Sequence, residues 1–246
     1  MKILTVVGAR PQFIKAAVVS RALSDAAIPE VMVHTGQHYD HNMSQVHFDT
    51  LGISPPAYNL EIAGGGHGAM TGRMMIALEE VMTKEKPSWV LVYGDTNSTL
   101  AAALVASKLH IPVAHVEAGL RSFNRKMPEE INRIVTDSIS NLLLCPTQTA
   151  VELLLAEGTT EGVHFVGDVM YDSVLYHLDL VEDVHRGEFI LATIHRPENT
   201  EYPKRLGSIL AALNDLPTPV VLPLHPRTRQ AIDKHSLILG SNIEVV

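Results

Sequence analysis

Apolar runs of four or five residues alternate along the chain with longer stretches in which apolar residues recur at helical spacing. The runs predict strands and the longer stretches predict helices. This alternation is typical of an α/β fold, in which a parallel sheet is covered by helices on both faces. The predicted strands of the first part are Ile3 to Val7, Val31 to His34, Trp89 to Tyr93, Val113 to Val116, Leu142 to Cys145 and Val163 to Val166. The predicted helices between them are Pro11 to Ala26, Met70 to Lys84, Ser98 to Lys108, Pro128 to Ser140 and Thr147 to Glu157.

The pattern changes after Asp168, where a charged segment without apolar periodicity precedes a new strand-like run. We therefore predict a first domain at residues 1–168, a connector at residues 169–186 and a second domain at residues 187–246. Few elements follow the connector, and they bury little apolar surface, so we expect the second domain to be incomplete. These elements are strands at Phe189 to Ile194, Pro219 to Leu224 and from Ile243, and helices near Pro203 to Leu213 and Arg227 to Lys234.

Composition narrows the class of protein. The chain has 246 residues, of which 46% are hydrophobic and 19% charged, so it is long enough for two compact domains. A formal net charge of −8 argues against a nucleic-acid partner. No apolar run has the length of a signal peptide or of a membrane span, so we expect a cytoplasmic protein without a membrane partner. The single cysteine, Cys145, lies in an apolar run and is predicted to be a buried structural thiol.

Carboxylates stand at three strand or helix ends in the first domain. Asp95 follows a predicted strand in the segment GDTNST, Glu117 ends one in HVEAGLR, and Glu129 and Glu130 open a helix in PEEINR. The carboxyl ends of parallel strands open onto one crevice, so we expect these acids to lie together there. Two carboxylates whose pKa values differ can divide acid and base work at neutral pH. Asp95 taken alone could equally be the N-cap of the next helix.

Arginines and lysines near these acids suggest where charge is balanced and where a phosphate binds. Arg121 and Arg133 are the neighbouring cations that could pair with Glu117. Arg10 and Lys15, in the segment GARPQFIK, surround the start of the first helix, whose backbone N–H groups could hold a phosphate. An ordinary first helix with solvated Arg and Lys side chains is the alternative.

Loops and the second domain add further candidate donors. Gln37 and His38 are candidate ligands for a sugar or phosphate; a metal site formed with His34 and His41 is an alternative that Gly36 makes less favourable. The glycine-rich segment AGGGHGAMTGR is either a connecting loop or a ligand-binding loop, with His67 and Arg73 as its donors. In the second domain the segments HRPEN and PLHPRTR place three candidate substrate contacts at strand ends: His195, Arg196 and His225.

The segments GARPQFIK, HTGQH, GDTNST, HVEAGLRS, PEEINR and HRPEN, taken in this order, resemble the non-hydrolysing UDP-N-acetylglucosamine 2-epimerases along essentially the whole chain. The resemblance implies two doubly wound, Rossmann-like domains that face each other across a cleft, as in the B-type glycosyltransferases. It also implies a UDP-sugar substrate, no metal or nicotinamide cofactor, a homodimer, and a role in making cell-surface polysaccharides.

In this family C2 of the sugar is inverted. UDP is eliminated from C1 while the C2 proton is removed, and UDP is added back after reprotonation on the other face. Matching the motifs implies that Asp95, Glu117 and Glu129 are the acid and base carboxylates. Arg10, Lys15 and His195 correspond to the phosphate-side and catalytic contacts of the family.

The chain departs from the family pattern in three segments. It reads TGQHYDHNM and GGGHGAM where epimerases of UDP-N-acetylglucosamine have TGQHREM and PGQSL. The GGGHGAMTGRM form is more similar to epimerases of UDP-2,3-diacetamido-2,3-dideoxyglucuronate, in which His67 or Arg73 would meet the added carboxylate. Family members also continue beyond a position like Val246, so we expect a C-terminally truncated chain. A UDP-sugar glycosyltransferase and an inactive UDP-sugar-binding remnant are the alternative functions.

Overall fold

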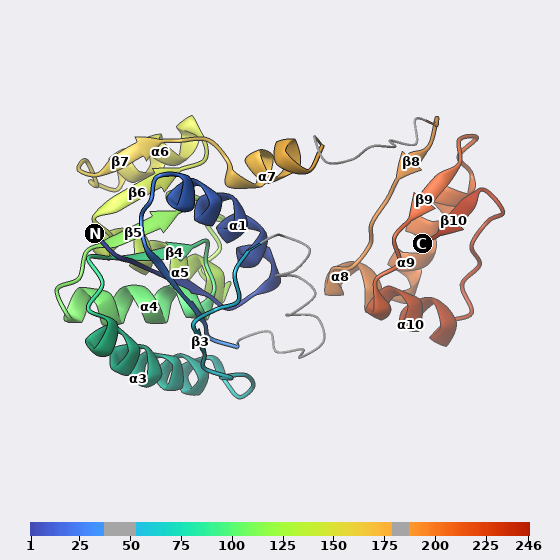
Figure 1. Ribbon diagram of the computed structural model, residues 1–246. Helices are drawn as coiled ribbons and strands as arrows, with labels where there is room; N and C mark the ends of the chain where they lie inside the picture. Colours follow the sequence, from blue (N-terminus) through green and yellow to red (C-terminus); the bar gives the residue numbers. More distant parts are fainter. Residues whose placement is uncertain (37–52, 179–186) are drawn as a thin grey trace. The chain divides into compact units, whose positions relative to one another are not determined.

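The computed structural model describes residues 1–36, 53–178 and 187–246. The chain divides into two compact units, Met1–Val181 and Glu182–Val246, and both are α/β. Each unit has its own parallel sheet, which confirms the predicted fold class (Figure 1). Among the described residues no helix is long and apolar enough to cross a membrane.

The first unit contains a parallel seven-stranded sheet in the order β3-β2-β1-β4-β5-β6-β7. The chain turns back from β3 to β4 beside β1, so the strand order reverses between β1 and β4. In open α/β sheets this reversal opens a crevice outside the carboxyl ends of the strands. The strands are β1 Ile3–Val7, β2 Glu30–His34, β3 Tyr58–Asn59, β4 Trp89–Tyr93, β5 Val113–Val116, β6 Leu142–Cys145 and β7 Val163–Phe165.

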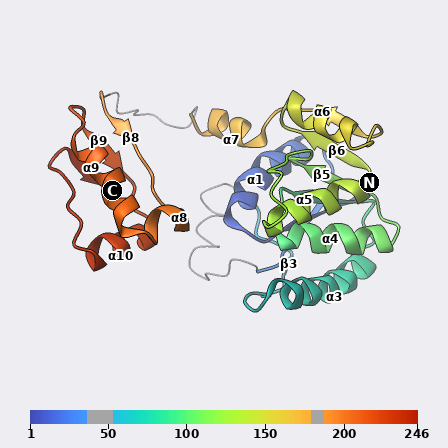
Figure 2. The ribbon, with the colours of Figure 1, turned by 180° about the vertical axis from the view of Figure 1, so that it is seen from behind.

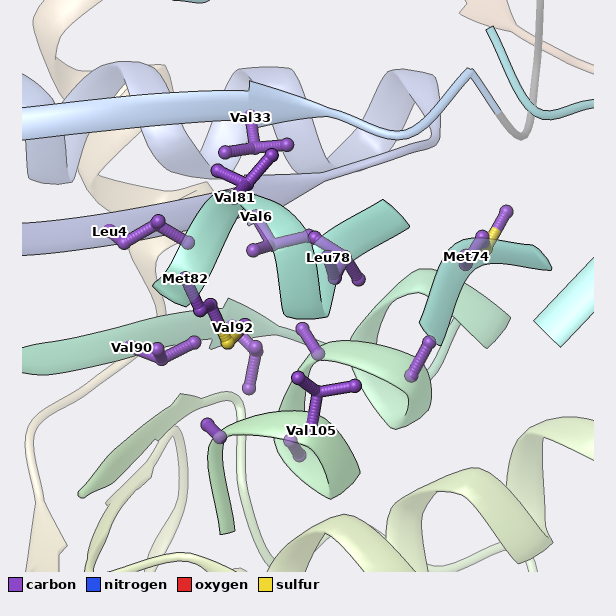
Figure 3. Packing of buried hydrophobic residues seen from close by; sticks show 14 of the residues in the cluster. Leu4, Val6, Val33, Met74, Leu78, Val81, Met82, Val90, Val92 and Val105 are labelled. Carbon is purple, nitrogen blue, oxygen red and sulfur yellow. The ribbon is translucent and has the colours of Figure 1, made fainter. Parts of the chain in front are cut away.

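Helices cover both faces of this sheet. Figure 1 shows α1 on the near face, and the reverse view in Figure 2 brings α4 and α5 to the front. Figure 3 shows side chains of α3 and α4 packed against the strands on that second face. The helices are α1 Arg10–Asp25, α3 His67–Glu85, α4 Asn97–Lys108, α5 Pro128–Ile139, α6 Gln148–Ala156 and α7 Val169–Leu178.

Alternate residues of the central strands enter two different cores. On β1, Leu4 and Val6 pack with Leu78 of α3 (Figure 3), whereas Val7 packs with Phe13 of α1. Both sets are apolar because a parallel sheet is buried on both faces. This is why the central strands read as continuous apolar runs and why their predicted bounds agree with the structure.

Helix α7 and the short strand β3 were not predicted. Helix α7 packs against α1, where the Arg21 guanidinium lies 3.6 Å from the centre of the Tyr176 ring. The first unit therefore runs past residue 168, the predicted end of the first domain, and part of the predicted connector is a helix that belongs to this unit. The apolar residues of α7 lie around the whole helix and several of them are exposed, so they do not form the single apolar face that reveals a core helix.

The second unit contains a parallel three-stranded sheet in the order β10-β9-β8, built from β8 Ile190–Leu191, β9 Val220–Leu222 and β10 Ile243–Val245. Its helices are α8 Pro197–Thr200, α9 Pro203–Asn214 and α10 Pro226–Lys234. A separate apolar core joins Leu206 and Leu210 of α9 to Leu222 and Ile232. The second unit thus has a small apolar core of its own, although the sequence predicted little apolar burial there.

Candidate active site

Three strand ends lie side by side at the carboxyl edge of the sheet in the first unit. Strands β1, β4 and β5 are neighbours, and each is followed at once by a turn that carries a candidate residue. Asp95 follows β4 in the turn that begins at Gly94, and Glu117 follows β5. Gly94 has a φ of +59°, and a Cβ atom on it would lie 3.0 Å from Glu117 Oε2. The two turns are therefore in close contact, as the sequence predicts.

Each of these two acids is paired with a cation from a helix. Lys15 of α1 donates to Glu117 Oε2, and Arg133 Nη1 of α5 lies 2.8 Å from Asp95 Oδ2. The structure thus gives Glu117 a different partner from the expected Arg121 or Arg133. Asp95 is not the N-cap of α4, because the side chain of Thr96 accepts the hydrogen bond from Thr99 N–H. The Asp95 carboxylate is therefore not used as a helix cap, and it can act as a charged group of the site.

Asp95 is the acid whose pKa responds to the whole cluster. Burial raises its pKa, and the negative charges of Glu117 and Glu129 act in the same direction, while Arg133 and Lys15 oppose the rise. Four charged residues therefore act on the Asp95 carboxylate. They include Glu117 and Glu129, the other two carboxylates that the sequence singled out, and both lie within electrostatic reach of Asp95.

Glu130, beside Glu129, is fully buried and holds a neighbouring loop. Its carboxylate accepts hydrogen bonds from the Ser122 N–H at 2.8 Å and the Phe123 N–H at 2.9 Å, and it pairs with Arg133 Nη2 at 3.1 Å. Burial acts to raise the pKa of Glu130, but these hydrogen bonds and Arg133 lower it on balance. Glu129 is half-buried. Of the pair Glu129 and Glu130, it is therefore Glu129 that remains available to a ligand.

Gln12 joins the first turn of α1 to the end of β4. Its Oε1 accepts hydrogen bonds from the N–H groups of Gly8 at 2.7 Å and Ala9 at 3.0 Å, and its Nε2 donates to the Tyr93 carbonyl at 2.7 Å. These two N–H groups, which precede the first residue of α1, are consequently not free to bind a phosphate. Arg10 is exposed at the start of α1, so a phosphate contact there rests on its guanidinium.

Arg121 lies in a buried ionic network instead of the crevice. Its side chain is 1% exposed; Nη1 lies 2.7 Å from Asp137 Oδ2, and Nη2 lies 2.7 Å from Glu157 Oε2. On the other side of Asp137, the Nδ1 atom of His115 lies 2.7 Å from Oδ1. Asp137 could not be singled out from the sequence, because it lies inside a helix and outside the PEEINR motif that precedes it. The contacts favour a structural role for Arg121 over substrate binding.

His67 and Arg73 stand at the start of α3. The Nδ1 atom of His67 lies 3.1 Å from Asn97 Nδ2, and Asn132 Nδ2 lies 3.3 Å from Asn97 Oδ1. Asn132 also donates to the Asp95 carbonyl at 2.8 Å, so a chain of amide contacts connects His67 to the turn that carries Asp95. Arg73 donates to two carbonyls of the glycine-rich loop and so holds that loop.

Of the remaining candidates, Gln37 and His38 lie outside the described residues, and the others are exposed. In the second unit the ring centres of His195 and His225 are 6.1 Å apart. Arg196 Nη1 lies 3.9 Å from Glu198 Oε1, and the side chain of Arg196 is 73% exposed. Among residues 1–36, 53–178 and 187–246, no group of three or more His, Cys, Asp or Glu side chains could hold a metal ion.

A family model described as UDP-N-acetylglucosamine 2-epimerase matches residues 21–246. The chain belongs to the UDP-N-acetylglucosamine 2-epimerase family. The match includes Asp95, Glu117 and Glu129 but begins after Arg10 and Lys15. The expected family is therefore confirmed.

Relatives within the epimerase family match the chain over its full length. It is 56% identical to the UDP-2,3-diacetamido-2,3-dideoxy-D-glucuronate 2-epimerase of Pseudomonas aeruginosa, covering 100% of this chain and 71% of the relative. The crystal structure of the Methanocaldococcus jannaschii UDP-GlcNAc 2-epimerase in complex with UDP-GlcNAc and UDP superimposes with a TM-score of 0.85 at 41% identity, covering 100% of this chain and 73% of that one. The Neisseria meningitidis UDP-GlcNAc 2-epimerase bound to UDP-GlcNAc gives a TM-score of 0.86 at 32% identity, with 100% and 72% covered.

Proposed function

We propose that this chain is a UDP-sugar 2-epimerase that inverts C2 of the sugar by eliminating and re-adding UDP. Family membership supports the class of reaction, and one observation supports the site: Asp95, Glu117 and Glu129 form a single cluster with Lys15 and Arg133 at the carboxyl edge of the sheet. Such a cluster supplies both proton acceptors and cations within one crevice.

The cluster fits the two demands of this reaction. The C2–H bond is only weakly acidic, so a positioned carboxylate has to accept the proton while the C1–O bond breaks and its electron pair leaves with the diphosphate. The departing diphosphate in turn needs cationic stabilisation. Asp95 and Glu117 have different surroundings, which suits one acid and one base on opposite faces of the ring. We assign the diphosphate contacts to Arg10 and Lys15 in the first unit, and to His195, Arg196 and His225 in the second.

UDP-N-acetylglucosamine, with UDP-N-acetylmannosamine as the product, is our first candidate substrate. A second candidate is UDP-2,3-diacetamido-2,3-dideoxyglucuronate, which is favoured by the 56% identity to the Pseudomonas aeruginosa epimerase of that sugar. His67 is the residue that we expect to distinguish the two, because it is exposed and connected through Asn97 to the Asp95 turn. We further propose a cytoplasmic homodimer that supplies sugars for cell-surface polysaccharides.

Solvent exchange at C2 tests this proposal. The purified chain is incubated in deuterated buffer with each candidate UDP-sugar and no acceptor, and the C2 position is followed by proton NMR. An epimerase introduces deuterium at C2 and forms the second epimer. A glycosyltransferase or an inactive remnant would bind UDP in calorimetry but leave C2 protonated, and this result would contradict the proposal. The sugar that exchanges faster identifies the substrate.

A further inference from the structure

A buried row of alternating charges lies beneath the carboxylate cluster. It runs from the buried side chains of His115, Asp137 and Arg121 to Glu157, whose side chain is 42% exposed, and each neighbouring pair is in contact at 2.7 Å. His115 is 0% exposed and lies on β5, two residues before Glu117. The proposed chemistry uses none of these four side chains directly. Because burying charge is costly, a buried ionic row of this kind calls for an explanation.

The contacts of His115 define its protonation. Its Nε2 lies 2.7 Å from the carbonyl oxygen of Gly94, which can only accept a hydrogen bond, so Nε2 carries a proton. Its Nδ1 lies 2.7 Å from Asp137 Oδ1. A neutral imidazole has one N–H, so an ionised Asp137 requires a second proton, on Nδ1.

Asp137 has the surroundings of an ionised carboxylate. Its Oδ2 accepts hydrogen bonds from the Gly119 N–H at 3.1 Å and from Arg121 Nη1 at 2.7 Å. Burial acts to raise the pKa of Asp137, but His115 and Arg121 outweigh burial and lower it. With Asp137 ionised, both ring nitrogens of His115 are donors, and the pair is an imidazolium and a carboxylate.

This pair reaches both turns that carry reacting acids. His115 holds the carbonyl of Gly94, the residue before Asp95, and Asp137 holds the N–H of Gly119, two residues after Glu117. Each turn contains a residue with a positive φ, +59° at Gly94 and +74° at Glu117. A left-handed conformation is costly for Glu117 and persists only where surrounding contacts enforce it.

We propose that His115 and Asp137, as a buried imidazolium–carboxylate pair, are positioning residues that fix Asp95 and Glu117 relative to each other. Neither residue touches the substrate. The kinetic part of this inference rests on the proposed epimerase function, whereas the protonation of His115 does not. A displacement of about 1 Å at a reacting group can reduce turnover on the order of a hundredfold. Loss of the His115–Asp137 pair should therefore have a measurable effect on turnover.

Nitrogen-15 NMR of the whole chain, labelled at histidine, tests the protonation. The chain has 13 histidines, so the His115 signals are assigned by their loss in His115→Gln. If that variant does not fold, the signals that move in Asp137→Asn make the assignment. At neutral pH we expect both ring nitrogens of His115 to give the signals of protonated nitrogen. One unprotonated ring nitrogen would overturn the inference.

Kinetics of Asp137→Asn test the positioning. We expect kcat to fall about tenfold or more, while KM and the affinity for UDP change less than about twofold, because the groups that grip the nucleotide remain in place. The matched control is Glu85→Gln, which removes a carboxylate that pairs with Lys2 at 2.9 Å away from the cluster. An equal loss of kcat in both variants, or no loss in Asp137→Asn, would refute positioning. If the wild-type chain exchanges no deuterium, the proposed function fails, and the NMR result alone decides the ion pair.

Discussion

In both units parallel strands are followed by polar turns, but the charged side chains of these turns differ in how far they are buried. In the first unit the acids at the strand ends are paired and partly buried: the side chain of Glu117 is 23% exposed and that of Asp95 is 34% exposed. In the second unit Arg196 is 73% exposed, and His195 contacts Thr193 at 3.5 Å. Proton transfer needs groups that are held in place, whereas binding a flexible diphosphate tolerates cations that adjust to it. We therefore propose that the reacting acids belong to the first unit, whereas exposed cations of each unit bind the diphosphate.

The largest effect should come from removing a reacting acid. We expect Asp95→Asn or Glu117→Gln to lower the rate of C2 exchange on the order of a hundredfold or more, with UDP binding retained, because a general acid or base is lost. Exchange rates by NMR and UDP affinity by calorimetry are the measurements. Glu161→Gln, at an exposed carboxylate, is the control and should leave both unchanged. Normal turnover in either site variant would remove that residue from the mechanism.

A second test compares one glycine in each unit. At Gly8 a Cβ atom would clash with Ser98 Oγ, so Gly8→Ala should destabilise the first unit by about 1–3 kcal/mol. Gly207 lies inside α9, where the added atom would meet Leu237 Cδ2 at 3.7 Å, an ordinary contact. Gly207→Ala should therefore stabilise the second unit by up to about 1 kcal/mol. Denaturant unfolding measures both, and a tolerated Gly8→Ala would show that the turn after β1 is less crowded than the structure indicates.

A third test asks whether the exposed cations bind the nucleotide. Arg10→Ala and Arg196→Ala should each weaken UDP binding about tenfold, since a charge-assisted hydrogen bond contributes about 1.5–3 kcal/mol. Calorimetry with UDP measures this. Arg125→Ala removes another exposed cation of the first unit and is expected to leave the affinity unchanged. If Arg10→Ala behaves like Arg125→Ala, the guanidinium of Arg10 is an ordinary surface charge.

The smallest effect concerns stability in acid. The folded-state pKa of Glu130 lies below its ordinary value, so its contribution to stability is present above about pH 4.5 and is lost as the pH falls through the folded pKa. Glu130→Gln cannot titrate, so its free energy of unfolding should fall less steeply below about pH 4.5. Unfolding at a series of pH values measures the slope. Glu244→Gln, at an exposed position of β10 in the second unit, should keep the wild-type slope; an unchanged slope in Glu130→Gln would contradict the role of its hydrogen bonds.

The strands and the positions of the acids could be predicted from the amino-acid sequence. Trp89–Tyr93 and Val113–Val116 are buried on both faces, so their apolar runs have sharp ends, and Asp95 and Glu117 follow those ends directly. The grouping of the acids followed from the parallel sheet, because strand ends of such a sheet share one edge. The motifs added the family, which the comparisons confirm.

The pairing of the charges could not be predicted in this way, because it depends on the folded arrangement of helices and sheet. Glu117 pairs with Lys15, which is 102 positions away in the chain, and not with the nearer Arg121. Local spacing carries no information about such pairs, since they depend on where helices dock on the sheet. The same holds for Asp137, whose contact with His115 is invisible until α5 lies against β5. The pattern of apolar residues predicts for each position whether it is buried. An ion pair, in contrast, depends on two distant residues and on the fold that brings them together.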